Sequence, residues 1–93
     1  SYTNAIALNG EPNCELLVSR GCAYLVGKRG DLALSDFNAA LKLLPDHPVI
    51  LINRALAFRD LDKQANAITD LNRVIELWPT HTRSYFIRAE LYA

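Results

Sequence analysis

The 93-residue sequence has no methionine, only two cysteines, and no excess of charge, with ten basic and ten acidic residues. A phosphate-tracking protein needs clustered Lys and Arg to displace counterions, so zero net charge argues against a nucleic-acid partner. The same balance argues against electrostatic attachment to an anionic membrane. No apolar run approaches the roughly 20 residues that span a bilayer. We therefore expect neither nucleic acid nor membrane among its partners.

The two cysteines, Cys14 and Cys22, are too far apart on one helix to form a disulfide. Their separation corresponds to about 12 Å of helical rise, whereas bridged Cα atoms lie within about 7 Å. We expect free thiols and an intracellular, cytoplasmic location, where thiols stay reduced. The spacing of the cysteines and the two histidines matches no zinc motif, so no metal site is predicted.

Residues that would carry catalysis are also missing. The carboxylates are scattered, no Ser or Cys nucleophile has a His within helical reach, and no Gly-rich phosphate loop is present. We expect no enzymatic activity, no cofactor and no small-molecule substrate. No basic stretch followed by an apolar core marks a signal peptide. Because the chain begins at Ser1 and lacks Met, we expect an internal part of a longer protein.

What the sequence does contain is an internal repeat of 34 residues. Residues 14–47 align without a gap to residues 48–81, and nine of 34 positions are identical. A third copy starts at Thr82, and residues 1–10 resemble the end of a preceding copy. Self-similarity at a fixed period of this length indicates helical units that stack on one another.

Each copy predicts two antiparallel helices. In the first helix, Leu17, Gly21 and Tyr24 recur at the spacing of one helical face. An apolar stripe that ends before Pro45 indicates the second helix. Asp31 is expected to act as the N-cap of this second helix.

These residues resemble the tetratricopeptide repeat pattern, W-x2-L-G-x2-Y, then A-x3-F, then P. The copies read Leu17-x2-Arg20-Gly21-x2-Tyr24, Ala33-x3-Phe37 and Pro45; then Leu51-x2-Arg54-Ala55-x2-Phe58, Ala67-x3-Leu71 and Pro79; then Tyr85-x2-Arg88-Ala89-x2-Tyr92. The resemblance covers essentially the whole chain. Its departures are Arg in place of Leu, and Leu or Tyr in place of Trp.

The resemblance implies an all-α fold, a right-handed superhelix of antiparallel helix pairs. Residues 1–10 would end the second helix of a preceding repeat, and residues 14–47 and 48–81 would each form one repeat. Residues 82–93 would form the first helix of a further, truncated repeat. The implied function is that of a scaffold module in a multiprotein complex, which binds a protein or peptide in a concave groove lined by the first helices.

The residues expected to face this groove are unusually apolar at its centre. The expected partner-binding set is Val18, Cys22, Val49, Ile52, Asn53, Leu56, Arg83 and Phe86. Contiguous apolar surface usually marks an interface, so we expect an apolar helix or extended segment of a partner to bind there. The alternative is that adjacent repeats of the same chain cover this surface.

Some members of the family hold the acidic tail of heat-shock chaperones with Lys, Asn and Arg side chains. Asn53 and Arg83 match two positions of that clamp. Val18, Cys22 and Ile87 occupy the others, and none of them supplies the Lys, Asn or Arg donor that such a clamp uses for a carboxylate. A clamp of this kind is therefore not expected.

Arginine and aspartate also recur with the repeat. Because Arg20 and Arg54 occupy one repeat position and Asp36 and Asp70 another, the period predicts an Arg20–Asp36 pair and an Arg54–Asp70 pair. Each pair would join the two helices of its repeat. The alternative is a ladder of arginines, continued by Arg88, that binds an acidic ligand.

Two further functions stay open. An RNA-binding repeat of the pentatricopeptide kind has a similar helix pair with a slightly longer period, although the zero net charge weighs against it. The chain could also be a regulatory helical segment of a larger enzyme.

Overall fold

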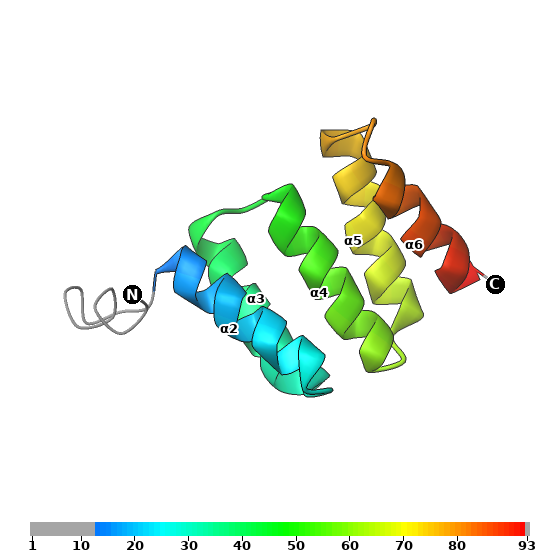
Figure 1. The fold of residues 1–93 in the computed structure, drawn as a ribbon. Helices are drawn as coiled ribbons and strands as arrows, with labels where there is room; N and C mark the ends of the chain where they lie inside the picture. The colour runs from blue at the N-terminus through cyan, green and yellow to red at the C-terminus, as the bar shows by residue number, and fades with distance from the viewer. Residues whose placement is uncertain (1–12, 93) are drawn as a thin grey trace.

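The computed structural model describes residues 13–92, which form five α-helices joined by short turns (Figure 1). The helices are α2 (Cys14–Val26), α3 (Gly30–Leu43), α4 (Pro48–Asp60), α5 (Gln64–Leu77) and α6 (Thr82–Tyr92). Each helix packs on the next along the chain, and α2 also contacts α4. The all-α prediction is confirmed. The helix expected within residues 1–10 lies outside the described residues, and the repeat boundaries remain a prediction.

The helix ends follow local chemistry. Asn13 caps α2, because its Oδ1 accepts a hydrogen bond from the backbone N–H of Leu16 at 2.8 Å. The expectation that Asp31 is the N-cap of α3 is wrong: α3 begins at Gly30, and Arg29 occupies the cap position without a side-chain hydrogen bond. Asp31 lies instead in the first turn, where its carboxylate faces the positive end of the helix dipole.

The turn inside each helix pair has the same backbone conformation. Lys28 adopts φ 62° and Asp62, at the equivalent repeat position, adopts φ 60°. In both turns the following N–H reaches back to a helix carbonyl: Arg29 donates to Tyr24 and Lys63 to Phe58, each at 2.8 Å. Lys28 and Asp62 therefore each form a left-handed turn that closes the end of the first helix of their pair.

The apolar residues form two core clusters. The first consists of Leu17, Ala33, Phe37, Ala40, Ile50 and Ala57. The second consists of Leu51, Ile52, Ala55, Ala67, Leu71, Val74 and Ile87. Ile50 and Ala57 come from α4, so the first helix of the second pair completes the core of the first pair. Ile87 of α6 completes the second cluster in the same way, as expected for stacked repeats.

Small residues allow the helices of a pair to approach closely. Gly21 is buried, and a Cβ atom added to it would lie 2.6 Å from Cε1 of Phe37 on α3. The equivalent position in the second pair is Ala55, which shares its cluster with Leu71, and both are fully buried. The smaller Leu71 thus packs with Ala55, which has a Cβ, whereas the larger Phe37 packs against Gly21, which has none.

Both predicted Arg–Asp pairs are confirmed. Arg20 donates from Nε and Nη2 to the two carboxylate oxygens of Asp36 at 2.9 and 2.7 Å. Arg54 makes the same two bonds to Asp70 at 2.8 and 2.7 Å. Arg54 also donates from Nη1 to Oδ1 of Asn38 at 3.0 Å, so this one side chain connects α3, α4 and α5.

Candidate protein-binding groove

The face predicted to bind a partner lies where α2 and α4 run side by side (Figure 1). Two hollows lie between these helices, one near their N-terminal ends and one near their C-terminal ends. We call them the N-terminal hollow and the C-terminal hollow, and together the α2–α4 groove. Val18 and Cys22 stand one helical turn apart on α2, each beside one of the hollows.

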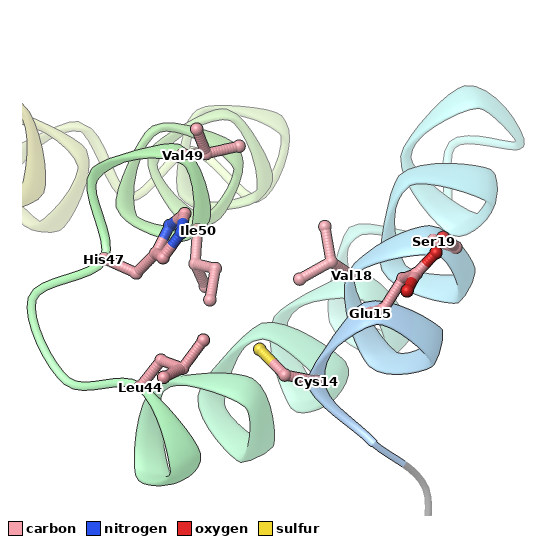
Figure 2. Close-up of a pocket in the computed structure, with 8 residues that line it drawn as sticks. All are labelled: Cys14, Glu15, Val18, Ser19, Leu44, His47, Val49 and Ile50. Carbon is pink, nitrogen blue, oxygen red and sulfur yellow. The ribbon is translucent and has the colours of Figure 1, made fainter. Parts of the chain in front are cut away.

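The N-terminal hollow has a volume of about 440 Å³ and a mostly apolar lining. Its lining residues are Cys14, Glu15, Val18, Ser19, Leu44, His47, Val49 and Ile50. Figure 2 shows Cys14 and Val18 of α2 facing Leu44 and Ile50 across the hollow, with Glu15 and Ser19 on its α2 rim. Glu15 is the only acidic group in this lining, and no lysine or arginine lies there.

The C-terminal hollow is smaller, about 300 Å³, and more polar. Its lining residues are Cys22, Leu25, Val26, Lys28, Asn53, Leu56, Arg59 and Asp60. Val26 is the most exposed large apolar residue of the described chain, with 85 % of its surface accessible. An apolar segment that entered the groove would therefore remove Val26 from water.

The structure brings five of the eight predicted groove residues together. Val18 and Val49 line the N-terminal hollow, and Cys22, Asn53 and Leu56 line the C-terminal hollow. Their role as contacts to a partner remains a prediction. Sequence reasoning missed Leu44, His47 and Ile50, which reach the groove from the inter-repeat turn and from the start of α4. Only the return of the chain from α3 to α4 places them there, so no periodic signal marked them.

The other three predicted residues lie apart from the hollows. Ile52 is only 7 % exposed, because it belongs to the core cluster that Ile87 of α6 completes. The expectation that Ile52 offers open groove surface is therefore wrong. Arg83 and Phe86 lie on α6, where both are exposed and neither lines a hollow.

Burial affects the two thiols of the groove. The pKa of Cys22 and that of Cys14 are both raised, because desolvation disfavours the thiolate. Both cysteines are free, as predicted. The Sγ of Cys14 lies 3.9 Å from the carbonyl oxygen of Ala40, to which the thiol donates. These groups therefore act as small, weakly polar lining residues rather than as nucleophiles.

One polar atom beside the groove is unsatisfied. Nδ1 of His47 is buried and has no hydrogen-bond partner within residues 13–92. The equivalent His81 differs, because its Nδ1 lies 2.6 Å from Oγ of Ser84 and its ring stacks on Trp78. Among the described residues no group of three His, Cys, Asp or Glu side chains could hold a metal ion. No described helix is long and apolar enough to cross a bilayer.

Searches against known proteins place the chain among helical repeat proteins. No protein-family model matches it. Tetratricopeptide repeat protein 36 of Caenorhabditis elegans is 35 % identical over 68 residues, which is 73 % of this chain and 38 % of that protein. Tetratricopeptide repeat protein 13 of Homo sapiens is 33 % identical over 93 residues, covering 91 % of this chain and 10 % of that protein.

Solved structures of tetratricopeptide repeat domains have the same fold as this chain. The first TPR domain of human RPAP3 superimposes with a TM-score of 0.87 at 27 % identity, covering 98 % of this chain and 71 % of that one. The first TPR of Spaghetti (RPAP3), bound to the HSP90 peptide SRMEEVD, matches with the same values. The curated relatives are much longer than this chain, which spans from 10 % to 38 % of their length.

The stacked helix pairs, the small residue where each pair meets and the repeated Arg–Asp bonds define an all-α helical repeat module. The chain belongs to the tetratricopeptide repeat family, as these relatives and structures show.

Proposed function

We propose that the α2–α4 groove binds a segment of a partner protein and that the chain serves as a scaffold in a multiprotein complex. The apolar N-terminal hollow carries this proposal. A space of about 440 Å³ lies within the range of pockets that accept several side chains of a ligand. An intracellular location is part of the same proposal.

The groove favours apolar side chains over an acidic tail. Glu15 lines the N-terminal hollow, and Val18 and Cys22 stand where a clamp would need donors. Ile87 is 5 % exposed and belongs to the core. The RPAP3 domain in the solved complex binds the acidic peptide SRMEEVD, and we expect this chain to bind that peptide weakly. A calorimetric titration of the chain with SRMEEVD would show no saturation at micromolar concentrations.

The experiment that tests the groove uses exposed positions, so that the variants fold. A photo-reactive phenylalanine analogue replaces Val49 or Val26 in the full-length protein in its own cells. Each residue lines one hollow, and they are 46 % and 85 % exposed. Leu43, which is 54 % exposed and lines neither hollow, is the matched control position.

We expect Val49 and Val26 to cross-link to one segment of a second protein and Leu43 not to do so. Val49→Asp should abolish the cross-link from position 26, and Val26→Asp should abolish the cross-link from position 49. Leu43→Asp should leave both cross-links intact. Cross-links from both hollows only to the protein's own flanking repeats would mean that the groove is filled within the same chain, and the proposal would be rejected.

A second candidate is a regulatory segment of a larger enzyme. One relative favours it: serine/threonine-protein phosphatase T of Trypanosoma brucei is 32 % identical over 81 residues, covering 17 % of that enzyme. The same cross-links distinguish the two candidates, since a regulatory segment would cross-link to a catalytic domain of its own polypeptide.

A further inference from the structure

The histidines that precede α4 and α6 occupy the same repeat position, but their rings have different neighbours. The ring of His81 stacks on Trp78, with centroids 4.1 Å apart and 26° between the planes. One repeat earlier, Leu44 stands at the position of Trp78 beside His47. Both Leu44 and His47 line the N-terminal hollow, and this lining contains no Phe, Tyr or Trp. The ring of His47 therefore lacks the aromatic neighbour that its counterpart has.

The N-terminal hollow lies between two consecutive helix pairs and not at the last helix of the chain. Its walls come from α2, from the turn before α4 and from α4 itself. Two wall positions carry smaller side chains than their counterparts one repeat later, Leu44 for Trp78 and Val18 for Ile52. Ile52 is buried, whereas Val18 stays partly exposed and Leu44 is 45 % exposed. The open space therefore lies where the first unit has less side-chain volume than the next one.

The rim of this hollow carries one charge. Glu15 is exposed on α2, and within residues 13–92 it forms no salt bridge. No lysine or arginine belongs to the lining. One repeat later the same position is the apolar Val49. A ligand that places a positive charge next to an aromatic ring would therefore meet the complementary charge at this rim.

We propose that the N-terminal hollow binds an aromatic side chain of a partner segment that carries a lysine or arginine next to it. This inference rests on the proposed function of the α2–α4 groove and names the chemistry of the ligand. The ring of the partner stacks on His47, as Trp78 stacks on His81. The positive charge beside it pairs with Glu15 at the rim of the hollow.

The shape of the hollow suits an aromatic ring. Figure 2 shows His47 and Leu44 on one side of the hollow, opposite Val18 and Cys14 of α2. A flat ring between these sides would contact the imidazole on one face and aliphatic and sulfur atoms on the other. The volume of about 440 Å³ lies in the range of pockets that enclose whole drug-sized ligands, so a single indole ring fits. Stacking on His47 favours an aromatic over an aliphatic side chain of similar size.

The first test titrates the ¹⁵N-labelled chain with tryptamine, which combines an indole ring with an ammonium group, and follows backbone amide shifts. Two matched probes separate these features: cyclohexylethylamine keeps the charge without the aromatic ring, and indolepropionate keeps the ring and reverses the charge. We expect shift changes centred on Val18, His47 and Ile50. Cyclohexylethylamine should bind about three- to tenfold more weakly, and indolepropionate about two- to fivefold more weakly. Glu15→Gln should abolish the preference for tryptamine over indolepropionate.

A variant that supplies the ring from within the chain provides a second readout. Leu44→Trp recreates the arrangement of Trp78 and His81, so it should no longer bind tryptamine, and its melting temperature should not fall. Leu43→Trp is the matched control, because Leu43 is 54 % exposed and lines neither hollow. It should bind tryptamine as the parent chain does. Equal binding of the three probes, tryptamine binding that survives Leu44→Trp, or no saturation at millimolar tryptamine would overturn the inference.

The second test uses the full-length protein with the photo-reactive analogue at Val49. The partner segment that cross-links there should contain an aromatic residue next to a lysine or arginine, and Leu44→Trp should abolish the cross-link. A partner segment without an aromatic residue would overturn this inference and leave the proposed function standing. Cross-links between two copies of the chain would also overturn it, because a second copy would then be the occupant. Cross-links only to the same chain, residues 1–12 included, would reject both this inference and the proposed function.

Discussion

Arg54 and Asp70 form a two-pronged bond across the second helix pair, with Nε···Oδ2 and Nη2···Oδ1 distances of 2.8 and 2.7 Å. The Asp70 side chain is 6 % exposed and the Arg54 side chain 25 % exposed. The hydrogen bond to Asp70 is the main cause that raises the pKa of Arg54. Removing either side chain would leave the other charge partly buried without its partner, so either loss should destabilise the fold.

We expect Asp70→Asn to lower the free energy of unfolding by about 2 kcal/mol, less than for a fully buried pair because Arg54 keeps some access to water. Urea unfolding followed by circular dichroism measures the change. The chain offers a matched control, because Arg73 makes the same fork to Asp46 at 3.0 and 2.9 Å on an exposed surface. Asp46→Asn should cost much less, because water screens both charges of this exposed pair, and equal losses would refute the role of burial.

The second prediction concerns Gly21. Gly21→Ala should destabilise the chain by about 1–3 kcal/mol, because the new Cβ would overlap the ring of Phe37. The change Phe37→Leu should restore part of this loss in the double variant, since it recreates the pair formed by Ala55 and Leu71.

Gly27 provides the control for that experiment. Its φ is −81° and a Cβ would find its nearest neighbour at 3.6 Å, so Gly27→Ala should be neutral or slightly stabilising. Thermal unfolding of the four variants side by side tests the steric argument. A double variant no more stable than Gly21→Ala alone would contradict it.

The third prediction separates core from groove on α4. Ile52→Ala should lower the free energy of unfolding by about 2–4 kcal/mol, because Ile52 is 7 % exposed in the core cluster. Val49→Ala, at a position that is 46 % exposed, should cost less than about 1 kcal/mol. Chemical denaturation of both variants checks this, and similar losses would show that Val49 is a core residue too.

The fourth prediction follows from the raised pKa of Cys22, whose cause is burial. At pH 8 the folded chain holds less thiolate than the unfolded chain, so iodoacetamide should alkylate a Cys14→Ser variant more slowly when it is folded. The folded state also keeps its proton to higher pH. The contribution of the Cys22 thiol to stability should therefore be fully present below the thiol pKa of the unfolded chain, and it should be lost as the pH rises through the higher pKa of the folded chain.

Mass spectrometry of alkylation against pH, with and without guanidinium chloride, measures the rates. Urea unfolding at pH 7.5 and pH 10, compared with that of Cys22→Ser, isolates the contribution of this thiol. A folded-state profile identical to that of the unfolded chain would show that Cys22 is not desolvated.

Much of the fold could be read from residues because it depends on periodicity. Arg20 and Asp36 are 16 residues apart, and so are Arg54 and Asp70. That recurrence places the arginine and the aspartate of each pair on the two helices that one turn joins, independently of the rest of the chain. The same period places Gly21 and Ala55 at equivalent positions of the two repeats. It did not identify the start of α3, because the backbone turn that fixes Gly30 leaves Asp31 inside the helix.

The sequence by itself determined the helix pairs, their phase and the bonds within each pair, since these contacts join residues at short, repeated separations. Only the tertiary structure decided which groove residues stay open. Ile52 and Leu56 lie on one helix face, yet Ile52 is buried because α6 places Ile87 against its cluster. Arg54 reaches Asn38 of α3, across the contact between one helix pair and the next, and Arg88 reaches Asn72 in the same way. Exposure and contacts between repeats depend on how far each helix pair rotates against the next, a quantity that no single repeat encodes.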